Sequence, residues 1–188
     1  MSRGFICGNA DMTNPTNWPN PERPGVEITL LGGHKCIIDE DKYDLVSPYN
    51  WTAMKRGDHI YARAKVKDGG KHKVLLMHRL ITSAPKGMVV DHINRNTSDN
   101  RMRNLRICTQ QQNCMNRLAN KNTPSGIKGI SWDKERSKWY AVIKLNQKNI
   151  FLGRFEDFDK AKEARINAEI RLFGQYAPSE IRNLGAAP

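Results

Sequence analysis

The chain has 188 residues and a formal net charge of +12, from 31 Lys and Arg against 19 Asp and Glu. This excess of positive charge favours a polyanionic partner, because neutralising phosphates releases their bound counterions. No apolar run approaches membrane-spanning length and no secretory hydrophobic segment precedes residue 25, so we expect a cytoplasmic protein that does not contact a membrane.

Residues 1–25 are rich in Asn, Pro and Gly, which predicts an extended or disordered arm. Residues 26–77 follow as a small β-rich unit, because apolar and polar residues alternate there as in half-buried strands. Asp68-Gly69-Gly70 is a hairpin turn signal, and residues 41–46 predict a short helical turn. The predicted strands are 26–30, 35–38, 60–66 and 73–77.

The positive charge lies mainly in the second half, since residues 78–118 and 119–188 each carry a net +5. In the β-rich unit, Arg63, Lys65 and Lys67 share one face of a predicted strand. We favour a solvated face there over a row that touches a DNA backbone.

The four cysteines form no CxxC pair. A structural zinc site usually needs two close pairs of Cys or His, so we predict no structural zinc. In a reducing compartment the thiols are then small core or surface residues rather than disulfide partners. They are Cys7, Cys36, Cys108 and Cys114.

Residues 78–118 are predicted to form the catalytic unit. A helical turn at 78–81 precedes two strands, 88–93 and 105–108, which a polar loop separates. Thr109 and Gln112 have the spacing of a capping box, which predicts a helix from Gln110 to Leu118.

The dipeptide Asp91-His92 lies in the first of these strands. Asp91 and Asn113 offer the hard oxygen ligands that a divalent cation needs, and His92 can be a neutral base near pH 7. Asn104 can orient the imidazole through its side chain or its backbone carbonyl. A polar hairpin with a satisfied histidine is the alternative, which a lone Asp-His pair would favour.

These residues resemble the phage and intron-homing branch of the HNH endonucleases. The resemblance rests on His78-Arg79-Leu80, Val90-Asp91-His92-Ile93-Asn94, Asp99-Asn100-Arg101, Asn104-Leu105-Arg106 and Asn113. It implies two strands and a helix around one divalent ion, Mg²⁺ or Mn²⁺, in a hydrolase that nicks or cleaves double-stranded DNA. It also implies His92 as general base, Asp91 and Asn113 as metal ligands and Asn104 as the residue that orients His92. The expected phosphate contacts are Arg95, Arg101 and Arg103.

Residues 119–125 have the composition of a linker. Beyond them, strand signals at 129–132, 139–145 and 149–153 precede a predicted helix from Asp159 to Phe173, with Gly174 placed to end it. Strand alternation predicts which side chains face that helix and which face outward. Facing the helix are Trp139, Ala141, Ile143 and Leu145, and facing outward are Tyr140, Val142 and Lys144.

Residues 126–177 resemble the DNA-binding domain of the plant ethylene-response-factor (APETALA-type) class. The matching segments are 126–132, 138–143 and 151–155, followed by the helix with Ala161 and Ala164. The resemblance implies a three-stranded antiparallel sheet that lies in the major groove, with the helix packed behind it. A solvated sheet face is the alternative for its lysines. The expected DNA contacts are Lys128, Trp132, Arg136, Lys138, Tyr140, Lys144, Lys148 and Asn149.

The whole chain is therefore expected to be α+β, with residues 126–180 as a DNA-binding domain behind the nuclease unit. We expect a metal-dependent, homing-type DNA endonuclease of phage or mobile-element origin, acting as a monomer in a bacterial host cell. The alternative is a non-catalytic DNA-binding regulator with a vestigial nuclease motif. An RNA reader is disfavoured, because the A-form major groove is too narrow for a sheet to enter.

Overall fold

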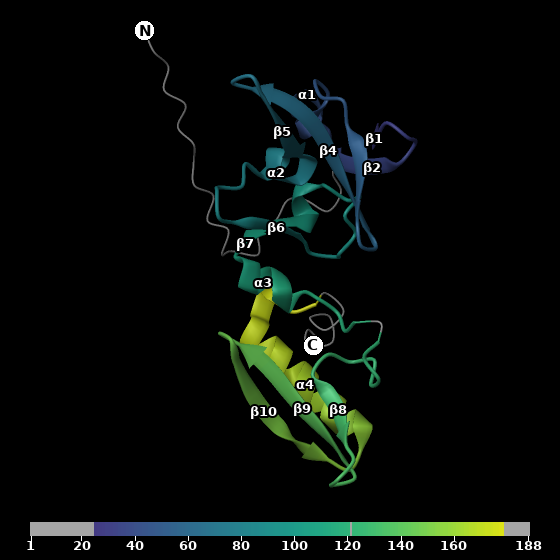
Figure 1. Cartoon of the computed structure of the whole chain (residues 1–188), viewed down its shortest axis with the longest axis vertical. Helices are drawn as coiled ribbons and strands as arrows, with labels where there is room; N and C mark the ends of the chain where they lie inside the picture. Colours follow the sequence, from purple (N-terminus) through teal and green to yellow (C-terminus); the bar gives the residue numbers. More distant parts are fainter. Residues whose placement is uncertain (1–24, 121, 179–188) are drawn as a thin grey trace. The chain divides into compact units, whose positions relative to one another are not determined.

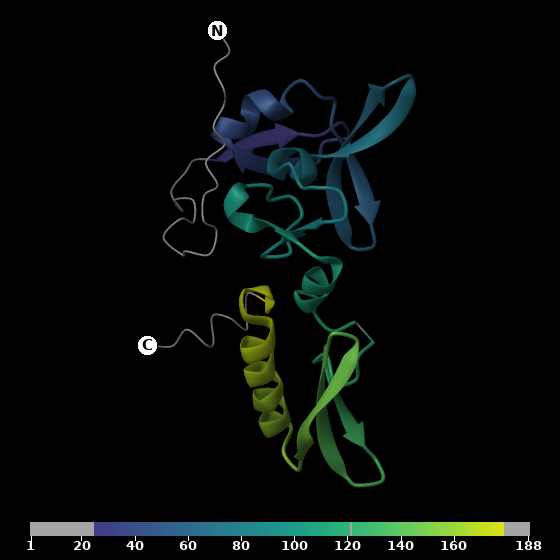
Figure 2. The same cartoon turned by 90° about the vertical axis from the view of Figure 1, so that its left-hand side faces the viewer.

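The computed structural model describes residues 25–120 and 122–178 (Figures 1 and 2). The predicted arm, except residue 25, and Cys7 lie outside the described residues. By compactness the chain divides into a first unit, residues 1–81 with 98–105, and a second unit, residues 82–97 with 106–188. Small antiparallel sheets and few helices make up both, which agrees with the α+β class. No helix in the described residues is long and apolar enough to cross a membrane.

The first unit contains two antiparallel sheets, one of order β1-β2 and one of order β3-β4-β5. Gly69 and Gly70 turn β4 into β5 with φ angles of 56° and 79°, the left-handed backbone that a two-residue hairpin loop requires. In chain order the elements are β1 (Gly25–Thr29), β2 (Lys35–Asp39), η2 (Glu40–Lys42), α1 (Tyr43–Val46), β3 (Thr52–Arg56), β4 (His59–Asp68), β5 (Lys71–Leu76), α2 (Met77–Thr82) and η3 (Met102–Asn104).

The four predicted strands of this unit and its helical turn are confirmed, and β3 is an additional strand. Ala62 and Ala64 of β4 are buried while Lys65 and Lys67 are exposed, as alternation predicted. The segment 98–100 then pairs with β2, since Ile37 N donates to Ser98 O and Asn100 N donates to Ile37 O, both at 2.8 Å.

The second unit contains the two-stranded sheet of β6 and β7 and a three-stranded antiparallel sheet of order β8-β9-β10. Helix α4 runs along one face of the larger sheet (Figure 1). In chain order the elements of the second unit are β6 (Val89–His92), β7 (Leu105–Cys108, of which Leu105 belongs to the first unit), α3 (Gln110–Met115), β8 (Ile130–Asp133), β9 (Lys138–Leu145), β10 (Lys148–Phe155), α4 (Phe158–Phe173) and η4 (Gly174–Tyr176).

The core of the second unit confirms the predicted strand faces. Ala141 and Ile143 of β9 are fully buried and pack with Ala161 and Ala168 of α4. The helix ends where expected, because Gly174 adopts a φ of 50° at its C-cap. Helix α3 is shorter than predicted, ending at Met115 instead of Leu118.

Candidate active site

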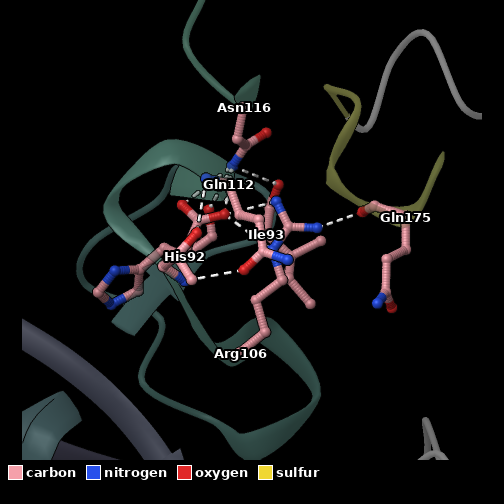
Figure 3. Close-up of polar contacts among 8 residues, drawn as sticks. His92, Ile93, Arg106, Gln112, Asn116 and Gln175 are labelled. Carbon is pink, nitrogen blue, oxygen red and sulfur yellow. Dashed lines mark hydrogen bonds and ion pairs between the residues drawn. The ribbon is translucent and has the colours of Figure 1, made fainter. Parts of the chain in front are cut away.

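Strand β6 places Asp91 and His92 side by side and almost completely buried, at 6 % and 4 % exposure. Neighbouring side chains of a strand point to opposite faces, so the carboxylate and the imidazole diverge. Figure 3 shows the imidazole of His92 directed away from Arg106 and Asn116. The two groups can therefore serve different partners from adjacent positions.

A capping box fixes the start of helix α3 directly after β7. The Thr109 side chain accepts a hydrogen bond from Gln112 N at 3.2 Å, and Gln112 Oε1 accepts one from Thr109 N at 2.8 Å. This confirms the predicted cap and satisfies two backbone donors that a helix start would otherwise leave unpaired. The helix and its C-cap present Asn113 and Asn116, three residues apart, which is the spacing of side chains on one helix face.

Asn116 is the amide that contacts Asp91. Its Nδ2 donates to Oδ1 and Oδ2 of Asp91 and to the carbonyl of His92, each at 3.1 Å. The residue is 2 % exposed, and its buried Oδ1 has no hydrogen-bond partner among the described residues. Asn113, the predicted ligand, is half-buried in α3, where its backbone N–H donates to Thr109 O at 3.0 Å.

Arg106 of β7 forms an ion pair with the same carboxylate. Its Nε and Nη2 both approach Oδ2 of Asp91, at 2.8 Å and 2.5 Å. The side chains of Arg106 and Asp91 are 12 % and 8 % exposed, so the pair is largely shielded from water. Hydrogen bonds to an ionised partner in such surroundings are stronger than those between neutral groups.

Asn104 lies in the first unit, buried at 4 % exposure, and its Nδ2 donates to Asp99 O at 2.8 Å. Asp99 in turn accepts hydrogen bonds from Arg101 Nε at 2.8 Å and Nη2 at 2.7 Å. Burial by itself would raise the pKa of Asp99, but the hydrogen bonds and charge of Arg101, with the charge of Arg103, outweigh it and lower that pKa. Arg101, an expected phosphate contact, is thus already ion-paired within the loop.

The remaining expected phosphate contacts differ in their surroundings. Arg95 occupies the turn after β6 with a φ of 63°, and its backbone N–H donates to His92 O at 2.8 Å. Arg103 is half-buried in η3.

The expected DNA contacts of the second unit fall on two faces. Tyr140 and Lys144 lie on the outward face of β9, and Lys144, Lys148 and Asn149 are exposed. Arg136 is exposed in the β8–β9 turn and pairs with Asp133 at 3.3 Å, and Lys138 pairs with Glu156 at 3.4 Å.

Trp132 and Lys128 do not lie on this outward face, where they were expected. Trp132 is opposite Trp139 in the strand register, edge-to-face at 5.2 Å, and Trp139 contacts Phe158 of α4, so both rings share the helix side. Lys128 donates its Nζ to Cys114 O at 3.0 Å, beside a cavity of about 560 Å³. Burial, aided by the charge of Arg165, lowers the pKa of Lys128.

Sequence reasoning missed Arg106 and Asn116 as partners of Asp91. Arg106 stands inside the Asn104-Leu105-Arg106 segment, where it was read as part of a motif without a contact of its own. The available signal for Asn116 was its position one helical turn beyond Asn113. Within the described residues, no cluster of three or more His, Cys, Asp or Glu side chains could hold a metal ion. The expected ligands, the carboxylate of Asp91 and the amide of Asn113, do not form such a cluster, because an asparagine is not one of these four residue types.

Comparison with known proteins links the site to one family. The family model described as HNH endonuclease matches residues 77–115. A protein of Acanthamoeba polyphaga mimivirus, described as an uncharacterized HNH endonuclease, is 30 % identical over 161 residues, which cover 83 % of this chain and 82 % of the viral protein. Protein 3.8 of Escherichia phage T7 is 39 % identical over 59 residues, 31 % of this chain and 49 % of that protein. No solved structure matches the chain. The family model ends before β8, so the expected class of the three-stranded sheet stays a prediction.

Proposed function

The chain belongs to the HNH endonuclease family, and on that basis we propose that it hydrolyses phosphodiester bonds of double-stranded DNA with the help of one divalent metal ion, Mg²⁺ or Mn²⁺. The observation that carries this proposal is the buried Asp91-His92 pair, whose carboxylate meets the amide side chain of Asn116, the C-cap of α3. We propose that the protein belongs to the homing branch of the family and that a single chain cuts one strand of the duplex.

The residues around Asp91 fit a hard divalent cation. The buried Oδ1 of Asn116 has no hydrogen-bond partner in the described part of the chain, and it belongs to the amide that contacts Asp91. Carboxylate and amide oxygens are the ligands that Mg²⁺ and Mn²⁺ prefer. Asp91 and Asn113 are the proposed ligands, with Asn116 as a second amide beside the carboxylate. Bound there, the ion would neutralise charge on the phosphate and stabilise the leaving oxygen.

His92 is the proposed general base. Its unprotonated ring nitrogen accepts a proton from the attacking water as the water oxygen bonds to phosphorus and the bond to the leaving sugar oxygen breaks. Asn104 is the proposed residue that orients His92. Arg95, Arg101 and Arg103 are the proposed phosphate contacts.

The three-stranded sheet of the second unit is proposed to bind DNA and to select the site. Support comes from the outward Tyr140 and Lys144 and from the net +5 of residues 119–188. Tethering such a reader to the nuclease raises the effective concentration of the nuclease at one locus. The second candidate is a regulator that binds DNA without cutting it. Its only support is the same outward face of the three-stranded sheet.

The test is a cleavage assay on supercoiled plasmid that carries the gene's own genomic neighbourhood, with Mg²⁺ or Mn²⁺. We expect metal-dependent nicking that EDTA stops and that His92→Ala slows by at least about 100-fold, since a positioned general base contributes about that much. His72→Ala, which removes an exposed histidine of β5, is the matched control and should cut like the unmodified protein.

Two outcomes would contradict the proposal. Equal cutting by His92→Ala would remove this residue from the chemistry. Tight binding of the same DNA without any cleavage would establish the regulator instead.

A further inference from the structure

Arg106 connects the Asp91 carboxylate to the C-terminal turn η4. On one side its Nε and Nη2 bond Oδ2 of Asp91, and on the other its Nη1 donates to the carbonyl of Gln175 (Figure 3). The Tyr176 ring lies under the guanidinium, with its centroid 4.8 Å from Cζ. All four residues belong to the second unit.

The contacts at the two ends of the guanidinium make its position specific. Arginine presents its N–H groups in a rigid planar fork, so holding Nη1 on a carbonyl and the ring face on an aromatic also fixes where Nε and Nη2 point. They point at a single oxygen, Oδ2. Oδ1 of Asp91 accepts a hydrogen bond from Asn116, and it is the carboxylate oxygen that Arg106 does not bond.

The turn η4, which contacts Arg106, packs on the same core as helix α3. Met115 of α3 packs on the buried hydrophobic cluster of Ile143, Ala168, Phe173 and Ala177, and the last two of these residues flank η4. Gln111 Nε2 donates to Asn146 Oδ1 at 2.7 Å, which adds a polar contact between α3 and the β9–β10 turn. The turn η4 and the helix that presents Asn116 therefore share one packed core.

We propose that Arg106 is a positioning residue which, anchored by Gln175 and Tyr176, acts as a tethered counter-cation of Asp91 and lowers the affinity of the nuclease site for its divalent ion. The inference rests on the proposed function, because it takes Asp91 as a metal ligand. The physical basis is direct: a guanidinium on Oδ2 repels a second cation and occupies lone pairs that the cation would otherwise use. The C-terminal turn thereby sets a property of the nuclease site.

The test measures Mn²⁺ binding to the full-length protein by isothermal titration calorimetry, without DNA. Arg106→Gln should bind Mn²⁺ at least about 10-fold more tightly, because it removes the competing charge. Tyr176→Leu leaves that charge but removes the stacked ring, and should tighten binding by about 2- to 5-fold, the value of an exposed to half-buried cation–π contact. Arg106→Lys keeps the charge without the fork and should lie between the unmodified protein and Arg106→Gln.

Arg154→Gln is the matched control, because this arginine also stacks on a ring and pairs with a carboxylate in the second unit. Its Cζ lies 5.2 Å from the Phe151 centroid and its Nε 3.2 Å from Asp133. Mn²⁺ affinity should not change in this variant. A purely structural role for Arg106 predicts the opposite sign, since loosening a site weakens binding, so unchanged or weaker affinity in Arg106→Gln overturns the inference.

Asp91→Asn separates the inference from the function on which it rests. Loss of Mn²⁺ binding in Asp91→Asn, together with an unchanged Arg106→Gln, overturns the inference and leaves the metal site standing. Unchanged binding in Asp91→Asn overturns both. If Arg106→Gln fails to fold, as judged by thermal unfolding, Tyr176→Leu decides, and unchanged or weaker affinity in that variant overturns the inference.

Discussion

The contacts that Asn116 and Arg106 make with Asp91 could not be predicted from the sequence residue by residue. Asp91 and His92 could be singled out because their chemistry and adjacency are visible in the sequence. The partners of Asp91 could not, since the choice between Asn113 and Asn116 depends on how far the capped helix is rotated and where it ends. Periodicity gives the shared face of the two amides but not which of them reaches the strand.

Asp99 offers a residue-scale prediction about acid stability. Its pKa is lowered in the folded state, so the contribution of its ion pair with Arg101 is present above the unfolded value, near pH 4, and is lost as pH falls through the folded one. Asp99→Asn should lower the free energy of unfolding by roughly 1–2 kcal/mol at pH 7, and the difference should shrink below about pH 4. Urea unfolding at pH 7 and pH 3 measures this. A difference as large at pH 3 as at pH 7 would show that packing, and not charge, accounts for it.

At the scale of elements, hairpins and capped helices could be predicted and the short strand β3 could not. Glycines at the β4–β5 turn and the Thr109–Gln112 pair are local signals, because each acts on backbone within a few residues. The sequence of β3 (Thr52–Arg56) shows no alternation of apolar and polar residues. This segment is a strand because it pairs with β4, a contact between segments that local sequence does not reveal. The same holds for segment 98–100, a polar stretch that joins β2.

The cap of α3 yields an element-scale prediction. Thr109→Ala removes the oxygen that accepts from Gln112 N, and should lower the free energy of unfolding by about 1 kcal/mol. Thr109→Ser keeps a hydroxyl in the same place and is the matched control. Chemical denaturation of both variants measures the loss. Equal stability of Thr109→Ala and the unmodified protein would mean that packing alone holds the helix start.

At the scale of the whole molecule, charge and sheet faces point to the outward face of β9 as the proposed DNA surface. Lys138→Ala with Lys144→Ala removes two cations from this face. We expect weaker binding of duplex DNA and a salt dependence whose slope falls by up to about 2, close to one for each lost phosphate contact. Fluorescence anisotropy across a salt series measures both quantities.

Lys160→Ala with Lys162→Ala is the control for that experiment, since it removes the same charge from exposed positions of α4, the helix behind the sheet. Equal loss of affinity in the two double variants would show that net charge, and not this face of the sheet, attracts the DNA.

The division of the chain into units has a consequence for how the protein loses its structure. The polypeptide passes from one unit to the other after residues 81, 97 and 105, so neither unit is a continuous stretch that could be expressed alone. Residues 98–105 complete the first unit although both of their neighbours in sequence belong to the second. Because the chain crosses between the units three times, unfolding of either unit releases loop ends of the other, which favours a single cooperative transition over two separate ones.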